Sequence, residues 1–255
     1  MAFIELTDVS LSYDTKGSSE PEIEQFNLTV EQGEFAVLLG PSGCGKSSIL
    51  NLIAGFIRPT SGTVSVDDEQ VREPSPQRGM VFQSVDAPLF HWLTTKQNIG
   101  FGLRTSQAEK EVLVEKYIRM VHLTGSEHKY PSELSGGMKQ RVQLARIWAM
   151  DPAVLLMDEP FANLDAITKE IMQQELQDLW LQTKKTIVYV THSIEEAVVL
   201  GQKVLIMTAG PRAHVKTEAR IALDYPRDPV SVDVIRYVRA LREDINEEVR
   251  KVPRR

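Results

Sequence analysis

The sequence has a single cysteine, Cys44, among its 255 residues. This excludes an internal disulfide and is typical of proteins that work in a reducing compartment. No apolar run approaches the roughly 20 residues that a helix needs to cross a bilayer. The first residues, Met1-Ala2-Phe3-Ile4-Glu5, also lack the basic region and apolar core of a signal peptide. We therefore expect neither a disulfide framework nor a membrane-spanning segment.

Positive charge is scarce relative to negative charge. The chain has 29 Lys and Arg residues against 35 Asp and Glu residues, which gives a net charge of −6. A surface that coats nucleic acid would be basic, so this balance argues against nucleic acid as a partner. The length allows one large domain or a domain with a subdomain.

Glycine is concentrated in one informative segment. It reads Gly40-Pro41-Ser42-Gly43-Cys44-Gly45-Lys46-Ser47 and matches the phosphate-binding pattern G-x-x-x-x-G-K-[ST], with a second hydroxyl at Ser48. An apolar run at 35–39 precedes it with the length of a buried strand, and apolar residues at helical spacing follow up to Gly55.

This order of strand, glycine loop and helix suits a phosphate. Glycines let the backbone wrap an anion, and the loop amides and helix N-terminus point toward it. Lys46 is expected near the β- and γ-phosphates, and Ser47 as a hydroxyl ligand for Mg²⁺. Cys44 either fills a permissive position of the pattern or is a reactive thiol whose pKa the cationic surroundings lower; we favour the first.

Three other predicted strands end in polar side chains. Residues 80–82 are followed by Gln83, an amide that could ligate Mg²⁺ or be an ordinary surface residue. Residues 154–157 lead to Asp158 and Glu159, which suit Mg²⁺ binding and activation of an attacking water. Residues 186–191 lead to His192, whose imidazole could contact a γ-phosphate. Because ligands of α/β folds bind at the carboxyl ends of strands, we expect these side chains at one rim.

A second glycine motif, Ser135-Gly136-Gly137, precedes a long helical run. It predicts either a helix N-terminus that holds an anion or a plain N-cap. Near the N-terminus, two strands up to Val30 with a polar turn at 14–21 suggest a small antiparallel sheet beside the nucleotide strand. Tyr13 could stack on adenine or be a half-buried edge residue.

Aromatic residues crowd the segment 84–103, where Phe90, Trp92 and Phe101 are either core of a small subdomain or exposed for a partner. Ser193 to Glu196 predicts a capping box that starts a helix. From Asp228, apolar residues keep helical spacing until Pro253 (Val234, Val238, Leu241, Ile245 and Val249). We expect this helix to pack on the body, since its polar face mixes acids with Arg and does not suit a membrane surface.

Together, these motifs resemble those of the ATP-binding subunits of ABC transporters, over nearly the whole chain to about Gly210. In that family residues 40–47 are the Walker A motif, residues 134–138 the signature motif, and residues 154–159 Walker B with its catalytic glutamate. Gln83 matches the Q-loop glutamine, Asp165 the D-loop aspartate and His192 the switch histidine. Tyr13 matches the aromatic residue that stacks on adenine.

A narrower likeness is to the importers of nitrate, sulfonates and taurine. It rests on residues 50–56, 78–83, 158–161 and 191–197. Asn163 stands where alanine is usual, Lys139 replaces a common arginine, and residues 89–92 lack a proline just before the tryptophan. The last difference lies where the family meets its membrane subunit, so the substrate and the permease stay open.

The resemblance implies an α/β fold, the P-loop NTPase fold of ABC ATPases, with a RecA-like core, a small antiparallel β subdomain and a helical subdomain. Residues 1–225 would form the ABC ATP-binding domain, with the helical subdomain at about 84–148, and residues 226–255 a C-terminal amphipathic helix tail. It assigns ATP binding to eleven residues: Tyr13, Gly40, Pro41, Ser42, Gly43, Cys44, Gly45, Lys46, Ser47, Ser48 and Gln83.

Mg²⁺ would be held by Ser47, Gln83 and Asp158, and Glu159 and His192 would be catalytic. Two copies would face each other head to tail, so that Ser135, Gly136 and Gly137 contact the partner copy's ATP. Phe90 and Trp92 would contact an integral membrane permease, with a solute-binding protein engaged indirectly. The subunit would lie peripherally on the cytoplasmic side of the inner membrane and drive uptake of a small anion.

Two other functions are weighed against transport. Soluble ABC ATPases that act on nucleic acid or ribosomes usually carry two cassettes or long coiled-coil insertions, and this chain shows neither. A regulatory module that holds ATP without hydrolysing it would not need Lys46, Asp158, Glu159 and His192 together.

Overall fold

The computed structural model describes residues 2–13, 21–84, 88–162 and 164–251. The predicted turn after Tyr13, Asn163 and the helix-ending Pro253 lie at least partly outside these ranges.

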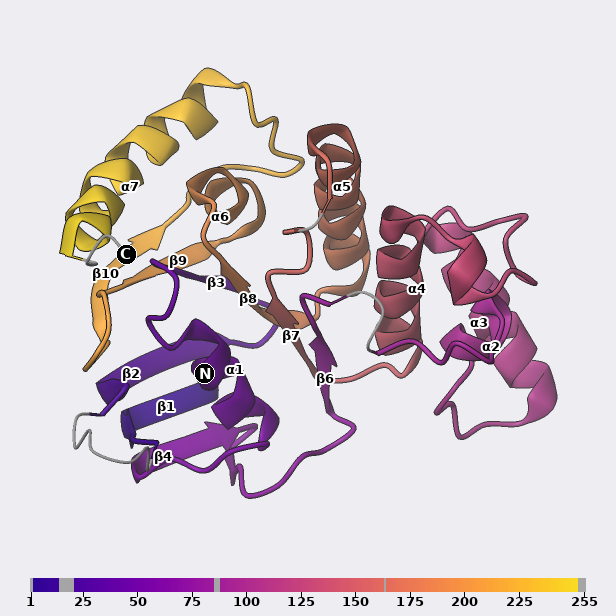
Figure 1. Cartoon of the computed structure of the whole chain (residues 1–255), viewed down its shortest axis with the longest axis horizontal. Coiled ribbons are helices and arrows are strands. Elements are labelled where there is room, and N and C mark those ends of the chain that lie inside the picture. The colour runs from indigo at the N-terminus through magenta and orange to yellow at the C-terminus, as the bar shows by residue number, and fades with distance from the viewer. Residues whose placement is uncertain (1, 14–20, 85–87, 163, 252–255) are drawn as a thin grey trace.

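A six-stranded sheet forms the centre of the molecule (Figure 1), in the order β10-β9-β3-β8-β7-β6. Neighbouring strands are parallel except for β9 and β10, which are antiparallel. The strands span β3 Phe35–Leu39, β6 Arg78–Val81, β7 Val154–Asp158, β8 Thr186–Thr191, β9 Lys203–Met207 and β10 Val215–Arg220. The inner strands are buried on both faces, which is why the sequence shows them as continuous apolar runs.

A second, four-stranded antiparallel sheet lies beside this one, in the order β2-β1-β4-β5. It contains β1 Ala2–Leu11, β2 Ile23–Glu31, β4 Ser61–Val66 and the short β5 Glu69–Gln70. The predicted antiparallel sheet is thus confirmed. Strand β1 has a register shift between Leu6 and Val9, where Asp8 adopts a positive φ of 50°.

Helices cover both faces of the central sheet. Helix α1 (Lys46–Ala54) lies between the two sheets, whereas α5 (Ala166–Thr183), α6 (Ile194–Leu200) and α7 (Val232–Lys251) lie on the opposite face (Figure 1). Alternate residues of β3 belong to two separate apolar cores. Ala36 and Leu38 pack in the core on the side of α1, and Phe35, Val37 and Leu39 pack in the core on the opposite face of the sheet.

The remaining helices form a group at one end of the sheet, reached through β6 and β7 (Figure 1). They are α2 (Thr95–Ile99), α3 (Gln107–Met120), the short 3-10 helix η1 (Pro131–Glu133) and α4 (Gly136–Ala149). The aromatic segment divides between the two predicted roles. Trp92 is 72% exposed and Phe101 is 47% exposed, whereas Phe90 is half-buried and its ring contacts both of theirs in a tilted arrangement.

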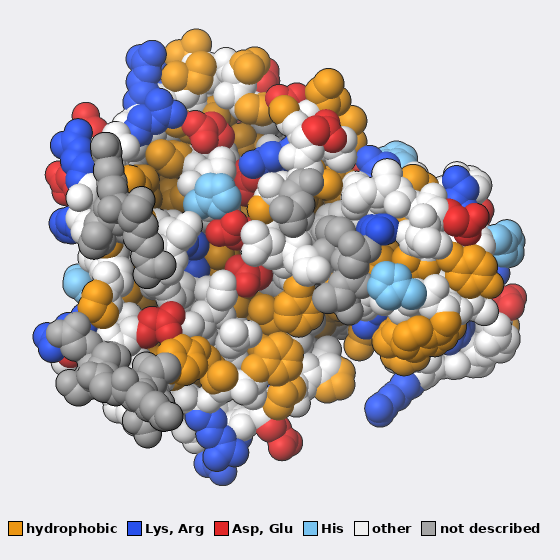
Figure 2. All heavy atoms as spheres, viewed as in Figure 1, with side chains coloured by type: hydrophobic (Ala, Val, Ile, Leu, Met, Phe, Trp, Pro, Cys, Tyr) orange, Lys and Arg blue, Asp and Glu red, His pale blue; other side chains and the backbone are white. Residues whose placement is uncertain are grey.

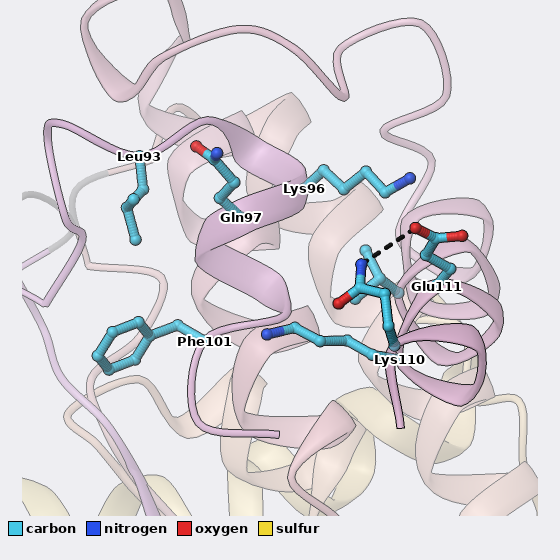
Figure 3. Close-up of a pocket in the computed structure, with 8 residues that line it drawn as sticks. Leu93, Lys96, Gln97, Phe101, Lys110 and Glu111 are labelled. Carbon is cyan, nitrogen blue, oxygen red and sulfur yellow. Dashed lines mark hydrogen bonds between the residues drawn. The ribbon is translucent and has the colours of Figure 1, made fainter. Parts of the chain in front are cut away.

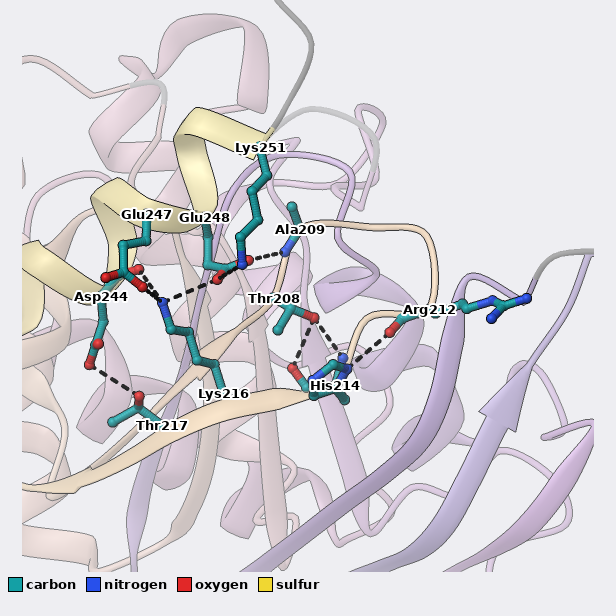
Figure 4. A network of polar contacts seen from close by, with 10 residues as sticks. All are labelled: Thr208, Ala209, Arg212, His214, Lys216, Thr217, Asp244, Glu247, Glu248 and Lys251. Atoms are coloured by element: carbon teal, nitrogen blue, oxygen red, sulfur yellow. Dashed lines mark hydrogen bonds and ion pairs between the residues drawn. The ribbon is translucent and has the colours of Figure 1, made fainter.

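Helix α7 confirms the predicted amphipathic helix with one correction. Val234, Val238, Leu241 and Ile245 are buried, but Val249 is exposed, so its predicted place on the packed face is wrong. Glu248 takes that place and is fully buried. The reason is that the last turn of α7 packs on polar groups: the Glu248 carboxylate accepts hydrogen bonds from the Ala209 amide and Lys251, and pairs with Lys216 (Figure 4).

The predicted capping box at α6 forms only in part. Ser193 accepts a hydrogen bond from the Glu196 amide at 3.2 Å, as an N-cap should. The Glu196 side chain does not return to the Ser193 amide. It accepts hydrogen bonds from Tyr189 and Thr191 inside the core instead. Within the described residues, no helix combines the length and apolar character that crossing a membrane requires.

Candidate nucleotide-binding site

The four polar strand ends meet at one rim of the central sheet. The glycine loop follows β3, Gln83 follows β6, Glu159 follows β7 and His192 follows β8. A cavity of about 320 Å³ opens there, lined by six residues of the loop and helix start together with Gln83, Glu159 and Glu22. Figure 2 shows acidic side chains grouped near the middle of this face. The predicted convergence at one rim is therefore present.

The loop backbone needs its glycines. Gly43 and Gly45 have φ values of +79° and +87°, in the left-handed region that favours glycine. A Cβ atom on Gly45 would lie 2.9 Å from Cγ1 of Ile23. Gly45 is also the N-cap residue of α1, so the free amides at the start of that helix face the cavity, where an anion is stabilised.

Lys46 is held inside the loop by the loop itself. Its ammonium group donates to the carbonyl oxygens of Gly40 at 2.9 Å and Pro41 at 2.8 Å, and the residue is only 5% exposed. A buried ammonium group is tolerated because these carbonyls replace water. The arrangement keeps one positive charge at the floor of the cavity.

Ser47 lines the cavity and contacts Asp158 behind it, and this pair suits a cation. The Ser47 hydroxyl donates to Oδ1 of Asp158 at 3.1 Å. Burial raises the pKa of Asp158, and the adjacent Glu159 adds to this, while the hydrogen bond from Ser47 and the charge of Lys46 oppose it. In the described part of the chain, no three His, Cys, Asp or Glu side chains could hold a metal by themselves. Hydroxyl and carboxylate oxygens nevertheless fit Mg²⁺, which usually takes one or two protein carboxylates and completes its shell with phosphates and water.

Glu159 and His192 form a pair at the same rim. Nδ1 of His192 lies 2.9 Å from Oε2 of Glu159. The backbone of Glu159 has a positive φ of 42°, unusual for a residue with a side chain, and its amide donates to the Val190 carbonyl at 3.0 Å. Such local strain concentrates at functional sites. It turns the Glu159 carboxylate toward the cavity and not into the sheet.

Cys44 is packed inside the loop and does not have the exposure or the lowered pKa of a reactive thiol. It is fully buried, and burial raises the pKa of its thiol despite the nearby Lys46. Its Sγ atom would lie 2.9 Å from a Cβ on Gly40, so the two residues pack against each other.

The sequence did not identify Glu22 as a site residue. Its Oε1 accepts a hydrogen bond from Ser48 at 2.9 Å, and Ser48 in turn lies 3.3 Å from the hydroxyl of Tyr13. Tyr13, 44% exposed, is therefore joined to the loop through Ser48. No local pattern points to Glu22, because it precedes β2 and reaches the cavity only through tertiary packing.

The second glycine motif lies apart from this cavity. Ser135 is the N-cap residue of α4 and accepts a hydrogen bond from the Met138 amide at 3.3 Å. Asp165 caps α5 in the same way through the Thr168 amide at 3.0 Å. Neither residue lines the cavity of its own chain, nor do Gly136, Phe90 or Trp92. A Cβ on Gly137 would meet Cγ2 of Thr168 at 2.8 Å, which explains that glycine by packing.

Comparison with known proteins agrees with this geometry. The ABC transporter family pattern matches residues 23–162. The chain is 41% identical over 235 residues to the nitrate import ATP-binding protein NrtD of Synechococcus elongatus, covering 90% of this chain and 85% of that protein. It is 42% identical over 232 residues to the bicarbonate transport ATP-binding protein CmpD of Synechocystis, covering 89% and 82%.

The aliphatic sulfonates import ATP-binding protein SsuB of Bacillus thuringiensis is 38% identical over 228 residues, covering 89% of this chain and 90% of that protein. Among solved structures, a dimeric post-hydrolysis state of an ATP-binding cassette bound to ADP and Pi superposes with a TM-score of 0.73 at 28% identity, covering 87% of this chain and all of that one. The predicted ABC ATPase fold is confirmed by this likeness. The chain belongs to the ABC transporter family, as one of its ATPase subunits.

Proposed function

We propose that this chain is the ATP-hydrolysing subunit of an ABC import system that takes up a small anion through a separate membrane subunit. The observation that supports this most is the meeting of three groups at one cavity: the buried ammonium of Lys46, the Ser47–Asp158 pair and the Glu159–His192 pair. They suit binding of a triphosphate, neutralisation of its charge and activation of water, respectively.

ATP would bind with its phosphates in the loop of residues 40–48 and its base against Tyr13. Phosphate oxygens would replace the Gly40 and Pro41 carbonyls as partners of Lys46. Ser47, Asp158 and Gln83 would hold Mg²⁺, which would supply positive charge at the β- and γ-phosphates when bound. The raised pKa of Asp158 is consistent with a carboxylate that is stabilised when a cation arrives.

Hydrolysis would depend on Glu159 and His192. The Glu159 carboxylate would orient the attacking water and accept its proton, as a general base within hydrogen-bond reach. His192, 2.9 Å away, would hold that carboxylate in place and lie close to the γ-phosphate.

The nucleotide would lie between two copies of the chain. Ser135, Gly136 and Gly137 do not line the cavity of their own chain, and the N-terminus of α4 leaves backbone amides free for an anion. A two-fold axis would bring this helix start onto the partner copy's phosphates and create both sites at once. ATP would then contribute contacts that exist only in the closed dimer, and hydrolysis would remove them.

The membrane permease would dock on the helical group. A pocket of about 340 Å³ lies between α2 and α3, with Leu93 and Phe101 on one side and Lys110 and Glu111 on the other (Figure 3). Hydrophobic side chains gather on this part of the surface (Figure 2), and Trp92 is exposed beside Phe90. We propose a short permease helix as occupant, with an apolar face against Phe101 and an acidic residue near Lys96 and Lys110. The subunit would thus be peripheral, on the cytoplasmic side of the inner membrane, and reach a solute-binding protein only through the permease.

The test is to purify the chain with its native permease and binding protein in lipid vesicles and to measure phosphate release. We expect ATP hydrolysis, and we expect it to be stimulated by one of the following solutes: nitrate, bicarbonate, an aliphatic sulfonate or taurine. The absence of hydrolysis with all partners present would favour a regulatory ATP-binding module instead. RNA or DNA affinity that falls steeply with salt would favour the nucleic-acid alternative.

A further inference from the structure

Gln143 joins the helix that carries the signature residues to the loop that carries Gln83. It lies in the middle of α4 and is 2% exposed. Its Oε1 accepts a hydrogen bond from the Phe82 amide at 3.2 Å, and its Nε2 donates to the Ser84 carbonyl at 3.2 Å. The two backbone groups flank Gln83, so one side-chain amide holds the chain on both sides of that residue. We call these two hydrogen bonds the Gln143 clasp.

The clasp is attached to a rigid element. Helix α4 begins at Gly136, directly after Ser135, so Gln143 lies about two turns beyond the residues expected to contact the partner's ATP. One turn further on, Ile147 lies on the same helix face. A Cβ on Gly79 would come within 2.6 Å of Cγ2 of Ile147, so α4 rests closely on the backbone of β6 there.

The loop at Gln83 is thus held from two directions. On one side it leaves β6, which pairs with β7 up to Val81 and so belongs to the central sheet. On the other side the clasp ties it to α4. A rotation of α4 about its contact at Gly79 would displace Gln83 relative to Ser47 and Asp158, which stay with the sheet.

We infer that Gln143 is a positioning residue that makes Gln83 follow the movement of α4. The distance of the Gln83 amide from the Mg²⁺ site then depends on the position of the signature residues at the start of that helix. The inference rests on the proposed function, because it takes Gln83 as a ligand of the nucleotide-bound metal. The plainer alternative is that Gln143 only provides hydrogen-bond partners for the Phe82 amide and the Ser84 carbonyl.

The substitution Gln143→Met distinguishes the positioning role from the purely structural one, because methionine fills a similar volume and makes neither hydrogen bond. The matched control is Gln140→Met on the same helix: Gln140 is also fully buried, but its amide has no hydrogen-bond partner in the described part of the chain. Thermal melting of both variants verifies the fold.

The readouts are ATP-analogue affinity by calorimetry at increasing Mg²⁺, and phosphate release with and without the permease. For Gln143→Met we expect Mg²⁺-free nucleotide affinity within about twofold of the unchanged chain, because the glycine loop is intact. Losing two neutral hydrogen bonds should raise the half-saturating Mg²⁺ about 10- to 30-fold. Stimulation by the permease should fall at least as much, with little change in KM for ATP. Gln140→Met should change neither the half-saturating Mg²⁺ concentration nor the stimulation by the permease.

A Gln143→Met variant that melts lower but keeps the Mg²⁺ dependence and the stimulation would overturn the inference in favour of the structural alternative. If Gln143→Met does not fold, Gln143→Glu keeps an acceptor for Phe82, removes the donor to Ser84 and places a carboxylate against the Ser84 carbonyl, so that the second contact is lost. It should raise the half-saturating Mg²⁺ about three- to tenfold, for one hydrogen bond, and an unchanged value would contradict the clasp. Failure of the unchanged chain to hydrolyse ATP with its permease would instead refute the proposed function.

Discussion

Replacing Glu22 by glutamine should strengthen ATP binding. Glu22 places a carboxylate in the cavity, 2.9 Å from the hydroxyl of Ser48. If a phosphate oxygen also bonds Ser48, the carboxylate lies no more than roughly 6 Å from it, since a hydrogen bond adds about 2.8 Å. Glutamine keeps an oxygen that can accept from Ser48 and removes only the charge.

The gain in the free energy of ATP binding follows from Coulomb's law. Two unit charges roughly 6 Å apart repel by about 0.7 kcal/mol in water and about 2.8 kcal/mol at an effective dielectric of 20. Glu22 is half-buried at an open cavity, so an intermediate value of about 1 to 2 kcal/mol applies. That corresponds to about 5- to 30-fold tighter binding.

Calorimetry with a non-hydrolysable ATP analogue measures this directly. Adenosine, which carries no phosphate, should bind Glu22→Gln as it binds the unchanged chain, and added salt should shrink the difference for the triphosphate. Glu24→Gln is the matched control: it removes the same charge two residues away, where the side chain lines a different cavity. Equal or weaker triphosphate binding by Glu22→Gln would show that the carboxylate does not face the phosphates.

Two further predictions concern other buried groups. Cys44 should resist iodoacetamide in the native protein at neutral pH and react only on unfolding, because it is buried and its thiol pKa is raised; rapid native alkylation, followed by mass spectrometry, would contradict its packed position. Burial would raise the pKa of Glu248, but hydrogen bonds from Lys251, the Ala209 amide and Lys216 lower it overall from 4.5 to about 2. The charged form is therefore favoured in the folded state, so this carboxylate contributes stability above pH about 4.5 and loses it as the pH falls toward 2. The free energy of unfolding should therefore fall less between pH 4.5 and about 2 in Glu248→Gln than in the control Glu243→Gln, whose side chain lies on the exposed face of α7. The same pH dependence in both variants would refute the assignment.

Most of the central sheet could be predicted because its strands are buried on both faces. Residues 35–39 and 187–190 form unbroken apolar runs, and the chemistry-bearing residues follow each of them within two positions in the sequence. Parallel strands place such residues at one edge, so the meeting of Lys46, Asp158, Glu159 and His192 needed no knowledge of loop conformation.

The residues that the sequence did not identify act across long separations. Glu22 reaches Ser48 over 26 residues, and Gln143 reaches Ser84 over 59. In the sequence, Gln143 is one polar residue in a helical run and carries no signal of a partner. Glu248 shows the same limit: periodicity favoured Val249 for the packed face, but the Ala209 amide and the lysine Lys216, which both bond to Glu248, favour a carboxylate there.

The central claim is that two copies of this chain clamp the same ATP. Glu159→Gln should bind ATP, hydrolyse it at least 100-fold more slowly because the general base is lost, and so keep the closed dimer intact. Light scattering should then show the mass of two chains with ATP and Mg²⁺ and of one chain, 28.7 kDa, without nucleotide. Adding Ser135→Arg should abolish the dimer while leaving ATP binding in place. If Glu159→Gln binds ATP and still scatters as a single chain, even together with the permease, the account is wrong.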